Sequence, residues 1–305
     1  PGGRFDAIMV FCPLMGAVAY AAILKRLKRV PLWLNVQDLP AEAALSGGIS
    51  GGAAARGMLR VEDALFNKAD VWSTISPAMV DSLSGKRRRN QPILYIPNWL
   101  HKTLAEAISS LPVKKEGPPS IPPNLLYSGN IGTKQNLLAF CRVLRDSRAD
   151  FRFVIQGEGS EARALREWLA AAADPRFEMR GLSDEQNLAR ALHETDYFVI
   201  TERGDSGGSF IPSKLIPSLA AGTPVLALCD ASSPLGREMN EQELGPQFEW
   251  KDAPRAADLL GGVDPGMYSG WRRHVLERAS FYDRERVLDV YAGELRKVMR
   301  GTLAA

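Results

Sequence analysis

Four short glycine-containing segments hold the residues best suited to chemistry in this sequence. Glycine lets backbone amides approach an anionic ligand closely, and a helix that begins after such a segment adds positive potential. Lys134 lies in the first segment and Lys214 follows the last. One such segment is typical of an ordinary turn, but four of them with two lysines predict a phosphate-bearing ligand. The segments are 127–134 (YSGNIGTK), 156–159 (QGEG), 180–182 (RGL) and 204–209 (GDSGGS).

Several other kinds of site are excluded by the same sequence. No Walker A motif occurs, and the glycines at 157–159 lack the third glycine of a dinucleotide-binding fingerprint. No Gly-x-Ser-x-Gly motif with a partnered histidine argues for a hydrolase. The cysteines and histidines are too scattered for a disulfide framework or a zinc site, so we expect a reducing compartment and no metal. They are Cys12, Cys141, Cys229, His101, His193 and His274.

Alternating strands and helices are predicted to position these segments. Short apolar runs are separated by stretches with helical spacing, a pattern typical of parallel sheets covered on both faces. The contents of 45% hydrophobic and 24% charged residues are those of a folded protein, and 305 residues suit two domains. Strands are expected at 7–12, 32–36, 71–75, 93–96, 125–128, 151–156, 177–180, 197–201 and 224–228.

A proline-rich stretch is predicted to divide the chain. Residues 109–123 (SSLPVKKEGPPSIPP) have no periodicity and are typical of a linker. We therefore predict an α/β protein with two Rossmann-like units, a partial one over 1–108 and a second over 124–270, followed by C-terminal helices over 271–305. The first unit has about four strands, so we expect it to lack its opening strands.

Five stretches, taken in order, resemble one enzyme family. They are 35–39 (NVQDL), 69–79 (ADVWSTISPAM), 96–99 (IPNW), 127–132 (YSGNIG) and 210–225 (FIPSKLIPSLAAGTPV). The combination resembles the retaining GT-B glycosyltransferases (glycosyl transferases group 1), above all the bacterial colanic-acid and exopolysaccharide type. The resemblance implies two Rossmann-like domains facing a cleft. The second domain would hold a nucleotide-diphosphate-sugar donor, and the first would hold the acceptor.

The resemblance also implies roles for individual residues. Asp38 would reach the cleft from the first domain and act in catalysis with Lys134, which would face the diphosphate with Asn130. Gly181 and Leu182 would line the base. The implied chemistry is transfer with retention, without cofactor or metal, because cations and amides stabilise the leaving diphosphate. The expected donor contacts are Gly129, Asn130, Gly157, Gly181, Leu182, Ser209, Phe210, Ile211, Ser213 and Lys214.

Departures from the family pattern keep a second interpretation open. Many relatives carry two glutamates eight positions apart around the donor-site helix, where this chain has Ser209 and Pro217; Gln37 stands where many have histidine. The leading hypothesis is a glycosyltransferase of surface polysaccharide synthesis with a lipid-linked acceptor. The alternative is a catalytically silent module that binds a nucleotide sugar or a partner. A sugar-nucleotide epimerase would need paired carboxylates and a histidine that are poorly supplied here.

Two basic clusters lie in the first third of the chain, at 25–29 (KRLKR) and 86–89 (KRRR). They are interpreted either as ordinary solvated charge or as attraction to an anionic membrane, at about 1 kcal/mol per nearby cation. Nucleic acid is not an expected partner, because no aromatic residues interleave with the cations. No run of eighteen apolar residues and no secretory leader occur. We therefore expect a cytoplasmic location, with peripheral contact at the inner face of the membrane as the sharper hypothesis.

Overall fold

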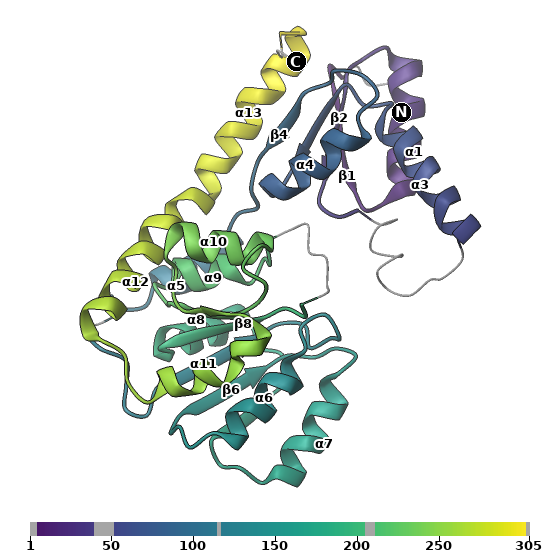
Figure 1. The fold of residues 1–305 in the computed structure, drawn as a ribbon. Coiled ribbons are helices and arrows are strands. Elements are labelled where there is room, and N and C mark those ends of the chain that lie inside the picture. Colours follow the sequence, from purple (N-terminus) through teal and green to yellow (C-terminus); the bar gives the residue numbers. More distant parts are fainter. Residues whose placement is uncertain (1–4, 40–51, 115–116, 205–210, 303–305) are drawn as a thin grey trace. The chain divides into compact units, whose positions relative to one another are not determined.

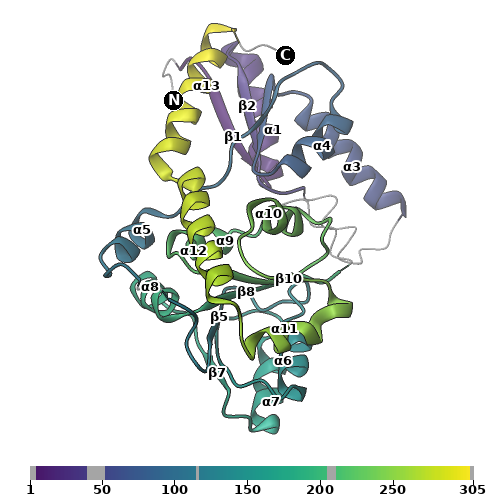
Figure 2. The same cartoon turned by 60° about the vertical axis from the view of Figure 1, so that its left-hand side comes forward.

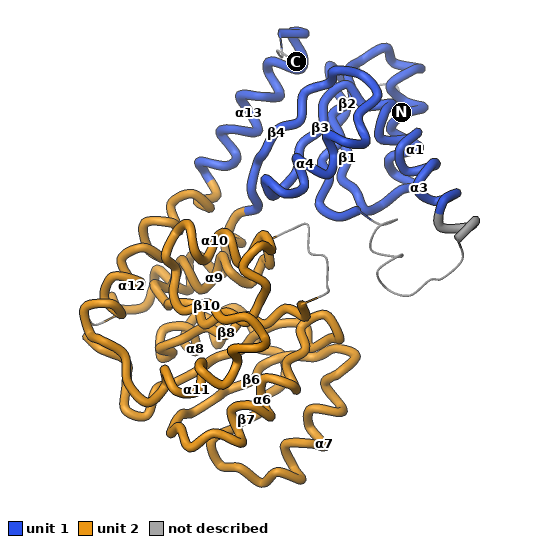
Figure 3. The backbone as a smooth tube through the Cα atoms, viewed as in Figure 1, with its two compact units in different colours: residues 1–98, 285–305 blue, residues 99–284 orange. Residues whose placement is uncertain are grey.

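The computed structural model describes residues 5–39, 52–114, 117–204 and 211–302. The chain divides into two compact units, residues 1–98 with 285–305 and residues 99–284 (Figure 3). The proline-rich stretch 109–123 therefore belongs to the second unit and does not separate two domains. Helix α5 (Lys102–Ser109), just before it, packs against α8 (Glu185–Glu194). Within the stretch, the Pro112 carbonyl lies 2.9 Å from His193 Nε2.

The first unit contains a four-stranded parallel sheet in the order β1-β2-β3-β4 (Figures 1 and 2). Strands β2 and β3 are buried along their whole length, as expected for apolar runs covered on both faces. All four expected strands are present, within one residue of their predicted ends. The strands are β1 (Ile8–Cys12), β2 (Leu32–Val36), β3 (Val71–Thr74) and β4 (Ile93–Tyr95), and the helices between them are α1 (Met15–Lys28), α3 (Gly52–Phe66) and α4 (Pro77–Lys86).

The last helix, α13 (Arg284–Arg300), belongs to the first unit although it ends the chain. Its Tyr291 ring stacks on the Trp33 indole of β2, with ring centroids 5.6 Å apart. The Asn35 amide donates to the Tyr291 hydroxyl at 2.8 Å. The helices expected over 271–305 are thus shared between the units, because an aromatic contact ties α13 to β2.

The second unit contains a six-stranded parallel sheet in the order β10-β9-β8-β5-β6-β7. The order runs outward in both directions from the β5–β8 pair, which makes the sheet doubly wound. Strands β8, β5, β6 and β7 are neighbours, so the glycine segments after β5, β6 and β7 share one sheet edge with Gly204 after β8, as predicted. The rest of the segment 204–209 lies outside the described residues. The strands are β5 (Asn124–Ser128), β6 (Arg152–Gln156), β7 (Phe177–Arg180), β8 (Tyr197–Thr201), β9 (Val225–Leu228) and β10 (Gln247–Phe248).

Two hydrophobic cores cover the two faces of this sheet (Figure 2). Helices α6 (Leu137–Asp146), α7 (Ala162–Ala172) and α11 (Ala253–Leu260) pack on one face with Leu125 and Tyr127. Helices α8, α9 (Leu215–Ala220) and α10 (Pro234–Gln242) pack on the other with Leu126. The alternation along β5 thus sends successive side chains to opposite cores. The remaining elements are α12 (Pro265–Ala279) and the 3₁₀ turns Trp250–Asp252 and Ser280–Tyr282.

Candidate functional site

The carboxyl ends of β5 and β8 mark the point where the strand order of the second sheet reverses. The chain leaves β5 into α6 on one face, and leaves β8 towards α9 on the opposite face. In open α/β sheets, ligands bind in the crevice between two such diverging connections. Tyr127 is the penultimate residue of β5, Glu202 directly follows β8, and Lys214 directly precedes α9.

The glycine loops after β5 and β6 are locked to one another. The Gly129 amide donates to the Gln156 carbonyl at 3.0 Å, and the Ile131 amide donates to the Glu158 carbonyl at 2.9 Å. A Cβ at Gly157 would lie 2.0 Å from the Gly129 oxygen, so only glycine fits there. Close approach of one loop to the other therefore accounts for Gly157 without any ligand.

These contacts correct the expectation that the loop amides face a phosphate. The amides of Gly129 and Ile131 are used between loops, and the Gly132 amide donates to Gln135 Oε1 at 3.1 Å. The Gly157 amide donates to the Arg180 carbonyl at 3.4 Å. These four amides are therefore already used within the fold, so side chains such as that of Lys214 become the first candidates for recognition of an anion.

Lys214 is a half-buried cation of this site. Its ammonium donates to the Tyr127 hydroxyl at 2.9 Å and lies 4.0 Å from the centroid of the same ring. The side chain also runs along Gly129, where a Cβ would lie 3.6 Å from both Lys214 Cε and Nζ. Burial lowers the pKa of Lys214 to about 8, and the charge of Glu202 partly opposes this shift. The ammonium has three donors, and two have no partner among the described residues.

Glu202 is a carboxylate that the sequence analysis did not select. Burial raises the pKa of Glu202 to about 7, while the Ser233 hydroxyl, 3.4 Å from Oε2, and the Lys214 charge act in the opposite direction. The two residues form no ion pair, although the structure describes both. The available signal was its position, because Glu202 directly follows a predicted strand and so lies at the ligand-binding edge of the sheet.

The other predicted residues of the β5 loop have different environments. The Asn130 amide donates to Gln135 Oε1 at 3.2 Å, and the Asn130 carbonyl accepts from the Tyr127 hydroxyl. The side chain of Lys134 is exposed, while its carbonyl accepts from the Arg203 amide at 2.8 Å. Lys134 is therefore available to a ligand but is not held in place as Lys214 is.

The remaining predicted donor contacts are spread along the same edge. Gly181 and Leu182 follow β7 and are exposed, Leu182 by 73%. Ile211 packs on the core below α9, and Ser213 is exposed. Ser209 and Phe210 lie outside the described residues. The roles of all these residues stay predictions.

Asp38 lies in the first unit, directly after β2 and Gln37. One of its carboxylate oxygens accepts from the Leu39 amide at 2.8 Å. Gln37 donates to Asn35 Oδ1 at 2.6 Å. Asp38 thus stands at the carboxyl end of a parallel strand, the position predicted for it within its unit, and its catalytic role stays a prediction.

Comparison with known families assigns both units. Residues 1–99 match the family described as "Glycosyl transferase 4-like domain", and residues 122–252 match the family described as "Glycosyl transferases group 1". The chain thus contains a glycosyl transferase 4-like domain followed by a glycosyl transferases group 1 domain. Both matches agree with the resemblance drawn from the sequence motifs.

Two curated relatives of this chain come from bacteria. The chain is 26% identical over 244 residues to the putative colanic acid biosynthesis glycosyl transferase WcaI of Escherichia coli K12, covering 76% of this chain and 59% of that protein. It is 23% identical over 262 residues to the probable glycosyltransferase WbjE of Pseudomonas aeruginosa, covering 80% of this chain and 63% of that protein. The chain thus spans about three fifths of the length of these relatives.

Solved structures show the same GT-B fold. Sucrose-phosphate synthase from Thermosynechococcus elongatus matches with a TM-score of 0.73 at 18% identity, over 97% of this chain and 74% of that chain. Anabaena HepE, solved in complex with UDP, matches with a TM-score of 0.72 at 15% identity, over 95% and 79% of the two chains. The predicted architecture of two Rossmann-like halves with parallel sheets is therefore confirmed.

Replacing Lys214 by methionine is expected to raise the free energy of unfolding at pH 7, because it removes a charge that burial disfavours. The pKa of Lys214 is about 8 in the folded protein against an ordinary 10.5, so the unfolded chain binds more protons between these values. Lys214 therefore stabilises the folded state increasingly from pH 8 to 10.5, while the buried cysteine thiols, whose pKa burial raises, act in the opposite direction. The variant should lose the part that Lys214 contributes. Lys114, whose pKa burial also lowers to about 8, supplies another part.

Urea titrations across this pH range measure the effect. Lys134→Met is the matched control, because Lys134 is exposed and its replacement should leave the pH profile unchanged. Identical profiles for the unmodified protein and Lys214→Met would contradict the burial of this charge.

Proposed function

We propose that this chain binds a nucleotide-diphosphate sugar at the switch point of its second unit and transfers the sugar to a saccharide acceptor with retention. The observation that carries the proposal is the Lys214 ammonium, held at the carboxyl end of β5 with two donors that no described residue occupies. HepE, which has the same fold, has been solved with UDP and with UDP-glucose. These ligands support a donor of the same class.

The positive charge of Lys214 is suited to stabilise the negative charge that develops on a departing nucleotide diphosphate. With a pKa of about 8, the ammonium is mainly protonated at pH 7. A partly desolvated charge acts more strongly on a developing negative charge than one in water, and its position is fixed before reaction. We propose that Lys214, with Lys134 beside it, supplies this stabilisation without a metal or cofactor, and that Asp38 acts from the first unit.

The alternative of a catalytically silent module rests on the carboxylates missing at positions 209 and 217. Glu202 supports the enzyme, because it brings a different carboxylate to the same edge of the sheet. Release of UDP or GDP from a panel of nucleotide sugars distinguishes the two, since a silent module would bind the donor without releasing its nucleotide. The anomeric configuration of the product, read by NMR, tests retention.

Replacing Lys214 by alanine should weaken UDP binding by about 1.5–3 kcal/mol, roughly ten- to a hundredfold in dissociation constant, because a hydrogen bond to a charged group is lost. Lys134→Ala should weaken binding less, since Lys134 is exposed and screened by water. Isothermal titration with UDP measures both losses. Uridine, which lacks phosphate, is the control ligand and should bind all three proteins equally. Unchanged UDP affinity in Lys214→Ala would contradict the proposal.

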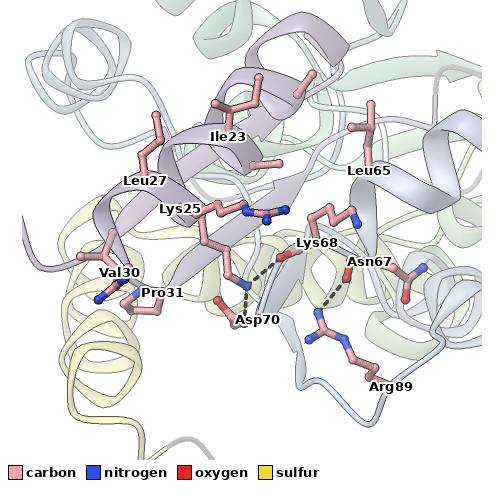
Figure 4. Close-up of a pocket in the computed structure, with 14 residues that line it drawn as sticks. Ile23, Lys25, Leu27, Val30, Pro31, Leu65, Asn67, Lys68, Asp70 and Arg89 are labelled. Atoms are coloured by element: carbon pink, nitrogen blue, oxygen red, sulfur yellow. Dashed lines mark hydrogen bonds and ion pairs between the residues drawn. The ribbon is translucent and has the colours of Figure 1, made fainter.

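We further propose that the acceptor is lipid-linked and that the first unit contacts an anionic membrane. The pathway that we propose is surface polysaccharide synthesis, as the name of WcaI suggests. None of the described helices is long and apolar enough to cross a bilayer. The first unit instead carries a groove of about 1430 Å³, lined by α1, the start of β2 and the segment between α3 and β3 (Figure 4). Arg89 joins it from the second basic cluster, so the two clusters border one surface.

The cations of this groove divide into paired and unpaired groups. The Lys25 ammonium pairs with the Asp70 carboxylate at 2.5 Å, and Arg89 donates to the Asn67 carbonyl at 2.7 Å (Figure 4). Arg26 and Arg29 are exposed and have no ion-pair partner in the described part of the chain. Exposed apolar side chains lie beside them, with Ile23 58% and Leu27 72% exposed. Unpaired cations next to apolar side chains suit the interface of an anionic bilayer.

Reversing two of these charges, in Arg26→Glu with Arg29→Glu, should lower binding to phosphatidylglycerol vesicles by about tenfold or more, because each cation near an anionic surface contributes about 1 kcal/mol. Sedimentation with vesicles measures it, and high salt should release the unmodified protein. The control is Arg163→Glu with Arg255→Glu, which changes the net charge equally at exposed positions of the second unit. Equal partition of the unmodified protein to neutral and anionic vesicles would contradict membrane contact.

A further inference from the structure

Tyr127 connects the Lys214 side chain to the loop that follows β5. It is fully buried on β5, and its hydroxyl takes part in two hydrogen bonds. The Lys214 ammonium has only protons to donate and the Asn130 carbonyl can only accept. The hydroxyl therefore accepts from Lys214 and donates to Asn130, and neither bond can be reversed.

The ring of Tyr127 supports the same arrangement. The Lys214 ammonium lies 4.0 Å from the ring centroid, within the range of a cation–π contact. Burial raises the pKa of the Tyr127 hydroxyl well above its ordinary value, so the group stays neutral and keeps its proton for Asn130. The phenol thus holds the ammonium without neutralising its charge.

The hold of Tyr127 on Lys214 prevents an ion pair between the Lys214 ammonium and the Glu202 carboxylate. The charge of Glu202 acts on the pKa of Lys214, yet the carboxylate and the ammonium form no ion pair, although the structure describes both residues. A lysine side chain has four rotatable bonds and gains by pairing with a nearby carboxylate. An ammonium paired in this way would have fewer donors and less net charge to offer a phosphate.

We propose that Tyr127 is a positioning residue for the donor diphosphate, whose hydroxyl holds the Lys214 ammonium at Gly129 and ties it to the Asn130 loop. This inference rests on the proposed function, because the benefit appears only when a nucleotide diphosphate binds. Tyr127 acts through Lys214 and need not touch the ligand itself.

The test is a double-mutant cycle with Tyr127→Phe and Lys214→Ala, read as UDP affinity by isothermal titration. Tyr127→Phe keeps the ring and removes only the hydroxyl. It should weaken UDP binding about fivefold, roughly 1 kcal/mol, because the Lys214 ammonium is then no longer held in place for the diphosphate. In the Lys214→Ala background the same change should have no further effect, because the residue through which it acts is absent.

Tyr197→Phe is the matched control. Tyr197 lies on the neighbouring strand β8, and its buried hydroxyl has no hydrogen-bond partner among the described residues. Its removal should leave UDP affinity unchanged. Far-ultraviolet circular dichroism and urea titration establish that each variant is folded before its affinity is compared.

The outcomes separate this inference from the proposed function. Failure of the unmodified chain to bind UDP, GDP or ADP and their sugars would overturn the proposed function itself. Binding by the unmodified chain that is unaltered in Tyr127→Phe would overturn only the positioning role. Equal losses from Tyr127→Phe with and without Lys214 would also overturn it, because they would indicate a general effect on the fold.

Discussion

The half-buried charge of Lys214 is the feature on which the rest of the site depends. The ammonium lies along Gly129 and is held by the ring and the hydroxyl of Tyr127. Tyr127 lies on β5 and Gly129 directly follows it; β5 is one of the two central strands of the second sheet. The doubly wound order then brings Glu202, from β8, to the same point. Removing a charge from water is unfavourable for the isolated fold, and a bound anion offsets that penalty.

The glycine loops act mainly as a rigid frame for this charge. Their amides bond to one another, and Gly157 is required because the Gly129 oxygen would lie 2.0 Å from any Cβ. A frame whose donors are already satisfied leaves little to rearrange when a ligand arrives. Precise placement of a few charged groups on rigid elements is what a binding or catalytic site needs.

The sequence predicted the local elements well and the long-range contacts poorly. Apolar runs such as 32–36 and 197–201 are strands because a fully covered parallel sheet accepts few other sequences, and the shared sheet edge followed from their order. The unit boundary was misplaced because α5 packs against α8 of the second unit. The place of α13 in the first unit was missed because its Tyr291 meets Trp33 from the far end of the chain. The bond between Lys214 and Tyr127 was not predicted, and Glu202 was not selected, because both depend on partners from other strands. Periodicity and turn propensity do not report such contacts.

A crystal structure of this chain in complex with UDP tests the central claim most directly. The account predicts that UDP lies at the carboxyl ends of β5 and β8, with a diphosphate oxygen within about 3.2 Å of Lys214 Nζ. Asn130 and Lys134 should lie on the same side of the ligand. UDP bound at another place on the second unit, or bound here with no phosphate oxygen in reach of Lys214, would contradict it.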